Sequence, residues 1–266
     1  MKPLPRARKR FGQHFLEPAW VARLVDLMEP SADDTFLEIG PGRGAVTGRL
    51  APRVSRIVCV EIDRDLAALL TQSMPSNVEV VTGDFLKTDL GALFTSPPDA
   101  VRVVGNLPYN VSSPILFKLL HGADARPRLR DATLMLQKEV AERLLAAPGS
   151  SAYGVLAIQT ARVADVARLL TLPPGAFRPP PQVTSALVQL RFRAPRVDVG
   201  DVAIFERVVR GVFLQRRKMM SNALQPVASA IGRSPSDLLA RAEIDPRKRP
   251  EALTLEEFAR LSRAVL

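Results

Sequence analysis

Apolar residues gather in short runs that alternate with helical repeats from residue 34 to about residue 190. The runs predict strands over 35–39, 56–62, 78–82, 101–105 and 132–137, and the repeats between and after them predict helices over 45–50, 66–73, 114–121 and 139–146. Strands interleaved with helices indicate a mostly parallel sheet that is covered on both faces. Two further apolar runs, 166–170 and 183–192, have no long helix between them, so we expect them to pair antiparallel at a sheet edge. The link over 172–181 is too rich in proline for a helix or a central strand.

Beyond residue 193 the pattern becomes purely helical. Helical repeats cover 202–215, 218–231, 236–242 and 254–265. Ser234-Pro235 is typical of a helix start, and Thr254 with Glu257 predicts a capping box. We therefore predict an α/β fold of Rossmann-like type with a small C-terminal all-α domain. The predicted divisions are a basic arm and lead-in helix over 1–33, an α/β domain over 34–194 and a helical domain over 195–266.

Charge adds a first indication of function. The net charge is +10, which favours a polyanionic partner. The basic residues also cluster, in an N-terminal arm that holds Lys2, Arg6, Arg8, Lys9 and Arg10, and in Arg216-Arg217-Lys218, which follow a helical pattern. Such clusters can be a solvated face, but clustering favours nucleic acid.

Other classes of protein are disfavoured by composition. The apolar runs are far shorter than a membrane span, and the basic N-terminus lacks the apolar stretch of a secretion signal. The single cysteine, Cys59, excludes a disulfide framework, and two histidines with one cysteine, widely spaced, argue against a metal site. We expect a monomer in a reducing cytoplasm, with no membrane partner.

A glycine-rich loop follows the first predicted strand. The loop over 38–44 reads Glu-Ile-Gly-Pro-Gly-Arg-Gly, Glu61 ends the second strand, and Asp84 follows the third. Together they predict a nucleotide-like cofactor at the carboxyl ends of the strands, where a carboxylate can accept both ribose hydroxyls. The spacing G-x-G-x-G differs from that of dinucleotide enzymes, and no phosphate-binding G-x-x-x-x-G-K-[ST] is present. Acidic groups favour S-adenosylmethionine, which carries a cationic sulfonium and no phosphate.

The fourth predicted strand runs into Asn106-Leu107-Pro108-Tyr109. If a methyl donor is held by the ends of the first three strands, we expect this position to lie beside its methyl group. The Asn106 side-chain oxygen and the Leu107 carbonyl can accept the two N–H bonds of an exocyclic amine on a base, which orients its lone pair. Tyr109 offers a stacking face, and Pro108 stiffens the turn. The motif favours methylation of a base amine over an ordinary strand–turn–helix junction.

These residues resemble a known family. Asn106–Tyr109 is similar to the N-[LI]-P-Y motif of ribosomal RNA adenine N6-methyltransferases. The other matching segments span nearly the whole chain: 9–16 (KRFGQHFL), 36–42 (FLEIGPG), 137–143 (QKEVAER) and 177–186 (FRPPPQVTSA). The resemblance implies dimethylation of two adjacent adenines near the 3′ end of small-subunit ribosomal RNA, with the RNA or an immature small subunit as partner.

Two branches of the family share these motifs. The stretches 137–143, 216–218, 222–224 and 249–254 resemble the small-subunit branch, and the erythromycin-resistance methylases of large-subunit RNA are the alternative. A fold that has lost catalysis and serves as a binding module, and a nicotinamide-dependent oxidoreductase, are the other hypotheses, which the intact motifs disfavour.

The resemblance also implies the site residues. Phe177 is expected to face Tyr109 across a flipped adenine and to close an aromatic sandwich. Members of the family often carry asparagine where this chain has His14, and either residue can contact the donor. The donor contacts implied are His14, Leu16, Gly40, Gly42, Glu61, Asp84 and Asn106.

Overall fold

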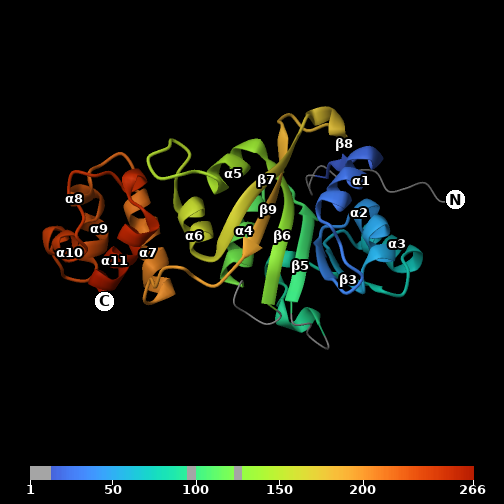
Figure 1. Cartoon of the computed structure of the whole chain (residues 1–266), viewed down its shortest axis with the longest axis horizontal. Coiled ribbons are helices and arrows are strands. Elements are labelled where there is room, and N and C mark those ends of the chain that lie inside the picture. The colour runs from blue at the N-terminus through green and yellow to red at the C-terminus, as the bar shows by residue number, and fades with distance from the viewer. Residues whose placement is uncertain (1–12, 95–99, 123–127) are drawn as a thin grey trace. The chain divides into compact units, whose positions relative to one another are not determined.

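The structure is a computed structural model that describes residues 13–94, 100–122 and 128–266 (Figure 1). The predicted basic arm over 1–10 lies outside the described residues. The chain divides into two compact units, one with the residues up to Ala141 together with Asp165–Arg193, the other with Glu142–Ala164 and Ala194–Leu266. The predicted α/β domain over 34–194 differs from this division because residues 142–164 group with the helical unit, where Tyr153, Ala157 and Ile158 join its apolar core.

The first unit is built on a seven-stranded sheet. Its strand order is β4-β3-β2-β5-β6-β9-β7. The strands are β2 (Thr35–Ile39), β3 (Arg56–Glu61), β4 (Val78–Thr82), β5 (Ala100–Asn106), β6 (Arg128–Gln137), β7 (Ala164–Leu172) and β9 (Ser185–Phe192). The five strands from β4 to β6 pair in parallel, and β9 runs antiparallel to β6. The predicted mostly parallel α/β fold is confirmed, and the two last strands are neighbours at the sheet edge, as expected.

Helices cover this sheet because its strands are apolar on both faces. Every residue of β2 is buried, which is typical of a central parallel strand. The helices that follow or precede the strands are α1 (Pro18–Leu27), α2 (Ala45–Leu50), α3 (Arg64–Ser73), α4 (Ser112–His121) and α5 (Lys138–Leu144). One apolar cluster joins α1 and α2 to the sheet through Val21, Leu50, Phe36 and Ile57.

A buried arginine near the amino end of β5 connects this strand to its surroundings through hydrogen bonds. Arg102 is 5 % exposed and donates to both carboxylate oxygens of Asp131 on β6, at 3.2 and 3.0 Å. It also donates to Asp34, at 2.7 Å, and to the carbonyl oxygens of Glu29 and Met28. Because the guanidinium is satisfied on all sides, the charge can be buried there, and it links two strands to the loop after α1.

A small two-stranded sheet lies outside the main one. Strand β1 (Phe15–Leu16) pairs antiparallel with β8 (Phe177–Arg178), with Phe15 opposite Arg178 and Leu16 opposite Phe177. The Glu17 amide adds a hydrogen bond to the Ala176 carbonyl, at 2.9 Å. The sheet thereby joins the N-terminal segment to the proline-rich link. The sequence pattern did not predict this pairing.

The second unit is helical throughout. Its helices are α6 (Val155–Val163), α7 (Val202–Phe213), α8 (Met220–Ala223), α9 (Gln225–Ser229), α10 (Pro235–Arg241) and α11 (Leu255–Val265). The predicted capping box begins α11: the Glu257 amide donates to Thr254 Oγ1 and the Thr254 amide donates to the Glu257 carboxylate. Phe205 of α7 and Phe258 of α11 are fully buried in one apolar cluster.

Two helical predictions for this unit were wrong. The repeat over 218–231 forms the two short helices α8 and α9, and Pro226 in the first turn of α9 cannot continue a preceding helix. Arg216-Arg217-Lys218 lie in the turn between α7 and α8, not on a helix. Arg216 is held in that turn by Glu251, at 2.8 Å, and by the Ser151 carbonyl.

None of the helices that the structure describes combines the length and the apolar character needed to cross a membrane.

Candidate active site

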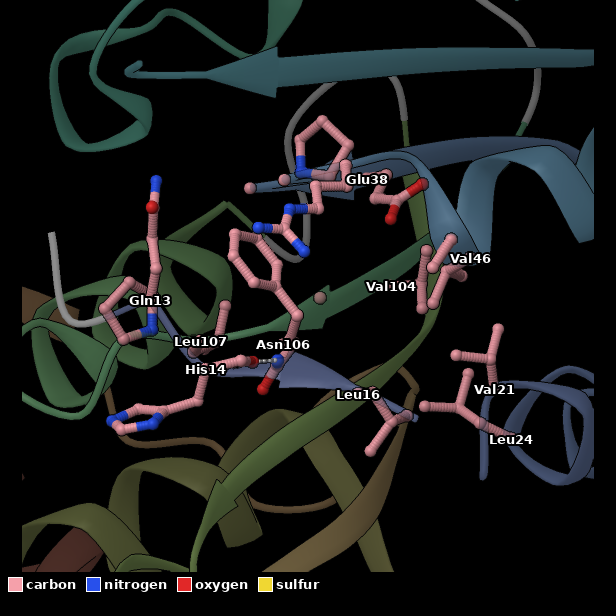
Figure 2. Close-up of a pocket in the computed structure, with 18 of the residues that line it drawn as sticks. Gln13, His14, Leu16, Val21, Leu24, Glu38, Val46, Val104, Asn106 and Leu107 are labelled. Carbon is pink, nitrogen blue, oxygen red and sulfur yellow. Dashed lines mark hydrogen bonds between the residues drawn. The ribbon is translucent and has the colours of Figure 1, made fainter. Parts of the chain in front are cut away.

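The first unit contains a cavity of about 350 Å³ at the carboxyl ends of β2, β3 and β5 (Figure 2). Open parallel sheets bind ligands at this edge, and the volume is within the usual range for ligand pockets. The lining comes from residues 13–18, from Val21 and Leu24 of α1, from the loop after β2 with the start of α2, from the end of β3, from 104–109 and from Arg178. The predicted site residues in this lining are His14, Leu16, Gly40, Gly42, Glu61, Asn106, Leu107, Pro108 and Tyr109.

The glycine loop has the backbone that its sequence predicts. Gly40, Gly42 and Gly44 all have positive φ, at 66°, 60° and 77°, where side chains with a Cβ are strained. A Cβ on Gly40 would meet no atom within 4 Å, whereas one on Gly44 would meet Leu70 and Met74 at 2.6 Å. A side chain at position 44 would have to displace the ends of the Leu70 and Met74 side chains, whereas Gly40 leaves its backbone open to the space around it.

Glu61 holds this loop in place. The residue ends β3 and is 3 % exposed. Its two carboxylate oxygens accept hydrogen bonds from the Gly42 and Asp63 amides, each at 2.9 Å. Burial raises the pKa of Glu61, against the lowering effect of those amides. A carboxylate has room for about four hydrogen bonds, so Glu61 can still accept a hydroxyl donor from a ligand.

Glu38, which begins the predicted glycine loop but was not among the predicted site residues, also lines the cavity. It is 3 % exposed and accepts a hydrogen bond from Thr47 Oγ1, at 2.7 Å. Burial raises its pKa to about 7, and the charge of Glu61 adds to the effect. The signal that could have found it was its place at the start of the glycine loop, one residue before the end of β2.

Asp84 stands two residues beyond β4 and outside the cavity lining. Its carboxylate accepts a hydrogen bond from the Leu86 amide, at 3.0 Å, and so starts a 3₁₀ helix over Phe85–Lys87. Lys118 of α4 donates to the carbonyls of Phe85, Leu86 and Thr88 and fixes the same turn. The structure thus gives Asp84 a local role and does not bring it to the cavity with Glu61.

Asn106 is oriented by the N-terminal segment. Its side-chain amide nitrogen donates to the His14 carbonyl, at 2.7 Å (Figure 2). This donation fixes the amide plane, so that Oδ1 is the end available to accept a hydrogen bond. Leu107 is buried, and its amide donates to the Met135 carbonyl of β6, at 3.2 Å. The strand end therefore presents a fixed acceptor at the cavity wall.

Tyr109 and His14 form an aromatic pair at the same wall. Their ring centroids lie 5.7 Å apart with an interplanar angle of 21°. The Tyr109 hydroxyl shares a hydrogen bond with Ser185 Oγ, at 2.7 Å, and His14 Nδ1 lies 2.8 Å from the Pro179 carbonyl oxygen. Burial raises the pKa of Tyr109. Both rings are therefore anchored at their polar atoms, with the proline-rich link supporting the histidine.

The expected sandwich of Tyr109 and Phe177 is not found in the structure. Phe177 is fully buried in the apolar cluster beneath α1 and α2 and does not line the cavity. Successive side chains of a strand point to opposite faces, so in β8 Phe177 points into the core while its neighbour Arg178 reaches the cavity. The ring that stacks on Tyr109 in the structure is that of His14.

Among the residues that the structure describes, no three or more histidine, cysteine, aspartate or glutamate side chains are grouped so that they could hold a metal ion.

Comparisons with known proteins agree with this geometry. A family model described as "Ribosomal RNA adenine dimethylase" matches residues 5–263. Proteins called "Ribosomal RNA small subunit methyltransferase A" are similar in sequence: that of Geobacter metallireducens is 43% identical over 98% of this chain and 96% of its own length, and that of Pseudomonas aeruginosa is 44% identical over 97% and 94%.

Two solved structures are similar in fold. A dimethyladenosine transferase from Plasmodium falciparum has a TM-score of 0.77 at 26% identity and covers 93% of this chain and 96% of its own. The 23S rRNA methyltransferase ErmE has a TM-score of 0.64 at 26% identity, over 94% of this chain and 99% of its own. The family model and the relatives that match over nearly the full length together show that this chain belongs to the ribosomal RNA adenine dimethylase family.

Proposed function

We propose that this protein dimethylates N6 of two adjacent adenosines near the 3′ end of small-subunit (16S) ribosomal RNA during ribosome maturation, with S-adenosylmethionine as the methyl donor. The full-length relatives named as small-subunit methyltransferases support this substrate. The observation that carries the chemistry is Asn106, whose amide is fixed by the His14 carbonyl beside Tyr109 and in the same cavity as the glycine loop.

The cavity suits this donor. When bound, S-adenosylmethionine supplies an electrophilic methyl group on a positively charged sulfur. Two buried carboxylates, Glu38 and Glu61, line the cavity and favour a cation, and the space at Gly40 admits a ligand to the backbone. We assign donor binding to His14, Leu16, Gly40, Gly42, Glu61 and Asn106. Asp84 is assigned through the family resemblance alone, because it lies outside the lining.

The chain's own residues position the acceptor base. Asn106 Oδ1 and the Leu107 carbonyl accept the two N–H bonds of the adenine amine and turn its lone pair toward the methyl group. Since His14 lies along one face of Tyr109, the adenine is expected to stack on the other face. A donor bound in this cavity would supply its methyl group to the N6 lone pair and would leave as the neutral thioether, which keeps the electron pair of the broken carbon–sulfur bond. The methylated amine would then lose its proton to water. No strong general base is needed.

The runner-up is a large-subunit methylase of the erythromycin-resistance type, which the fold similarity to ErmE keeps open. The TM-score with the dimethyladenosine transferase is higher, and both sequence relatives described above are small-subunit enzymes by name. We further propose that the protein acts as a monomer on immature small subunits in the cytoplasm, where ribosomes assemble.

The test is methylation of each purified ribosomal subunit. Small and large subunits from cells that lack these modifications are incubated with methyl-labelled donor, and the nucleosides are identified by mass spectrometry. We expect label in N6,N6-dimethyladenosine of the small-subunit RNA only. Label in the large subunit would support the resistance type, and no label in either would support a non-catalytic assembly factor.

A further inference from the structure

One buried acid in the cavity has no part in orienting the base. Glu38 lies one residue before the end of β2, and its carboxylate accepts a single hydrogen bond from a neighbouring side chain, Thr47 Oγ1. A carboxylate has room for about four such bonds. Glu38 is 3 % exposed and has few hydrogen-bond donors around it. Because buried charges are weakly screened, an ionised Glu38 would interact strongly with a charged ligand in the cavity.

The surroundings of Glu38 are apolar or acidic. Its register partners are Cys59 on β3 and Val104 on β5, and Figure 2 places it on the same side of the cavity as Val104 and Val46. The charge of Glu61 contributes to the raised pKa of Glu38. Burial and the charge of Glu38 raise the pKa of the Cys59 thiol, so Cys59 is neutral.

The cations that line the cavity are committed elsewhere in the described structure. The Arg43 guanidinium lies 4.2 Å from the centre of the Phe15 ring, and Arg178 pairs with Glu17, at 3.1 Å. His14, the remaining basic residue of the lining, stacks on Tyr109. None of these cations contributes to the pKa of Glu38, so the ionised form of Glu38 is open to a cationic ligand in the cavity.

We propose that Glu38 makes the cavity select the cationic methyl donor over its neutral thioether product, so that product leaves and donor enters between successive methyl transfers. This proposal rests on the proposed function. Two adenosines that each receive two methyl groups need four transfers, and after each one a product must exchange for a donor. Donor and product share their adenosine, amino and carboxylate groups and differ in one methyl group and one positive charge. A carboxylate that recognises this charge is therefore suited to drive the exchange.

Because the ionisation of Glu38 is linked to donor binding, the preference for donor over product should depend on pH. With a pKa raised to about 7 by burial, Glu38 is neutral in more acidic solution and ionised in more basic solution. A bound cation favours the ionised form, so donor binding should release a proton near neutral pH. Product, which lacks the sulfonium charge, should not. The preference for donor over product is then expected to rise as the pH increases from 6 to 8.

Titration calorimetry of the ligand-free full chain tests this directly. The ratio of the dissociation constants of S-adenosylhomocysteine and S-adenosylmethionine is measured at pH 6 and pH 8 for the natural protein, for Glu38→Gln and for the surface control Glu79→Gln. At pH 8 we expect Glu38→Gln to lower the ratio about tenfold, which corresponds to a shift of one pKa unit. The control should keep both the ratio and its rise with pH. An unchanged ratio in Glu38→Gln would overturn the proposal.

Two further measurements test the proposal without the Glu38→Gln variant. Calorimetry of the natural protein in two buffers of different ionisation enthalpy, at pH 7, should show proton release with donor and none with product. Thr47→Val keeps the carboxylate but removes the bond that lowers its pKa, so the rise of the ratio should move to higher pH. Equal proton release with both ligands would contradict the role of the sulfonium charge.

A third ligand separates charge from size. An analogue with a protonated amine in place of the methylated sulfonium should follow the donor, and it should lose affinity in Glu38→Gln. The outcomes also separate this proposal from the proposed function. If the natural protein binds donor and methylates small subunits but shows no selection, only the role of Glu38 fails. If it does neither, the proposed function fails.

Discussion

Burial at Glu38 should make the stability of the ligand-free protein depend on pH. The pKa of this group rises from 4.5 to about 7 on folding, so folding favours the protonated form. Its contribution to stability is full below pH 4.5 and is lost as the pH rises through 7. Glu38→Gln cannot ionise. We therefore expect the variant to gain on the order of 3 kcal/mol relative to the natural protein between pH 4.5 and pH 8. Urea unfolding at both pH values measures this, and a constant difference would contradict it.

Asn106 and Asn77 provide a matched comparison of two anchored amides. Asn106 donates to the His14 carbonyl in the cavity, and Asn77 donates to the carbonyls of Ala51 and Val54 away from it. Asn106→Ala removes the acceptor for the adenine amine and should lower the methylation rate about 10²–10³-fold. Asn77→Ala should cost about 1 kcal/mol of stability and leave the rate of the folded enzyme unchanged. Single-turnover methylation and thermal unfolding separate the two effects, and similar rate losses in both variants would refute a catalytic role for Asn106.

At the scale of elements, the loop between β2 and α2 depends on left-handed glycines. Gly40 and Gly149 both have positive φ, at 66° and 86°, and a Cβ on either would meet no atom within 4 Å. Alanine at each should therefore cost a similar backbone strain of about 1 kcal/mol. Only Gly40 lines the cavity, so Gly40→Ala alone should weaken donor binding. Calorimetry with S-adenosylmethionine checks this, and equal affinity in both variants would remove Gly40 from the donor site.

The same elements show how far the sequence could predict the fold. The strand over 35–39 was predicted with its observed bounds, because its apolar residues Phe36, Leu37 and Ile39 stand close together between turn residues. The pairing of β1 with β8 was not predicted, since strands of two residues have no measurable period and residues 15–16 lie far along the chain from 177–178.

That missed pairing also explains why Phe177 does not line the cavity. The family resemblance implied that Phe177 faces Tyr109 across a flipped adenine. The direction of a side chain on β8 depends on the pairing of that strand with β1, and in the structure Phe177 lies in the core. Residues carried by the ends of long parallel strands, such as Glu61 and Asn106, were placed correctly at the cavity because sheet topology fixes where those strands end. Roles of these residues in binding remain predictions.

At the scale of the whole molecule, the dominant feature is the excess of positive charge. The net charge of +10 suits a polyanion such as ribosomal RNA, and contacts to phosphates give affinity without sequence specificity. The second unit carries the cluster over 216–218 in an irregular turn. Within it, Arg216 has a structural partner in Glu251, whereas Arg217 and Lys218 are exposed. The exposed pair is therefore better placed for RNA than Arg216.

The salt dependence of RNA binding can test whether Arg217 and Lys218 contact phosphates. If Arg217 and Lys218 each neutralise a phosphate, the double variant Arg217→Ala/Lys218→Ala should lower the slope of log K against log salt by about 2 in magnitude for small-subunit binding. Affinity for S-adenosylmethionine should stay unchanged, because neither residue lines the donor cavity. The matched control is Arg233→Ala/Arg241→Ala, which removes the same charge from another part of the helical unit. This control should retain most of the salt dependence of the natural protein. Fluorescence titration of labelled subunits across a salt series measures both. Equal loss of slope in the two double variants would mean that the net charge of the unit, and not the turn over 216–218, provides the attraction.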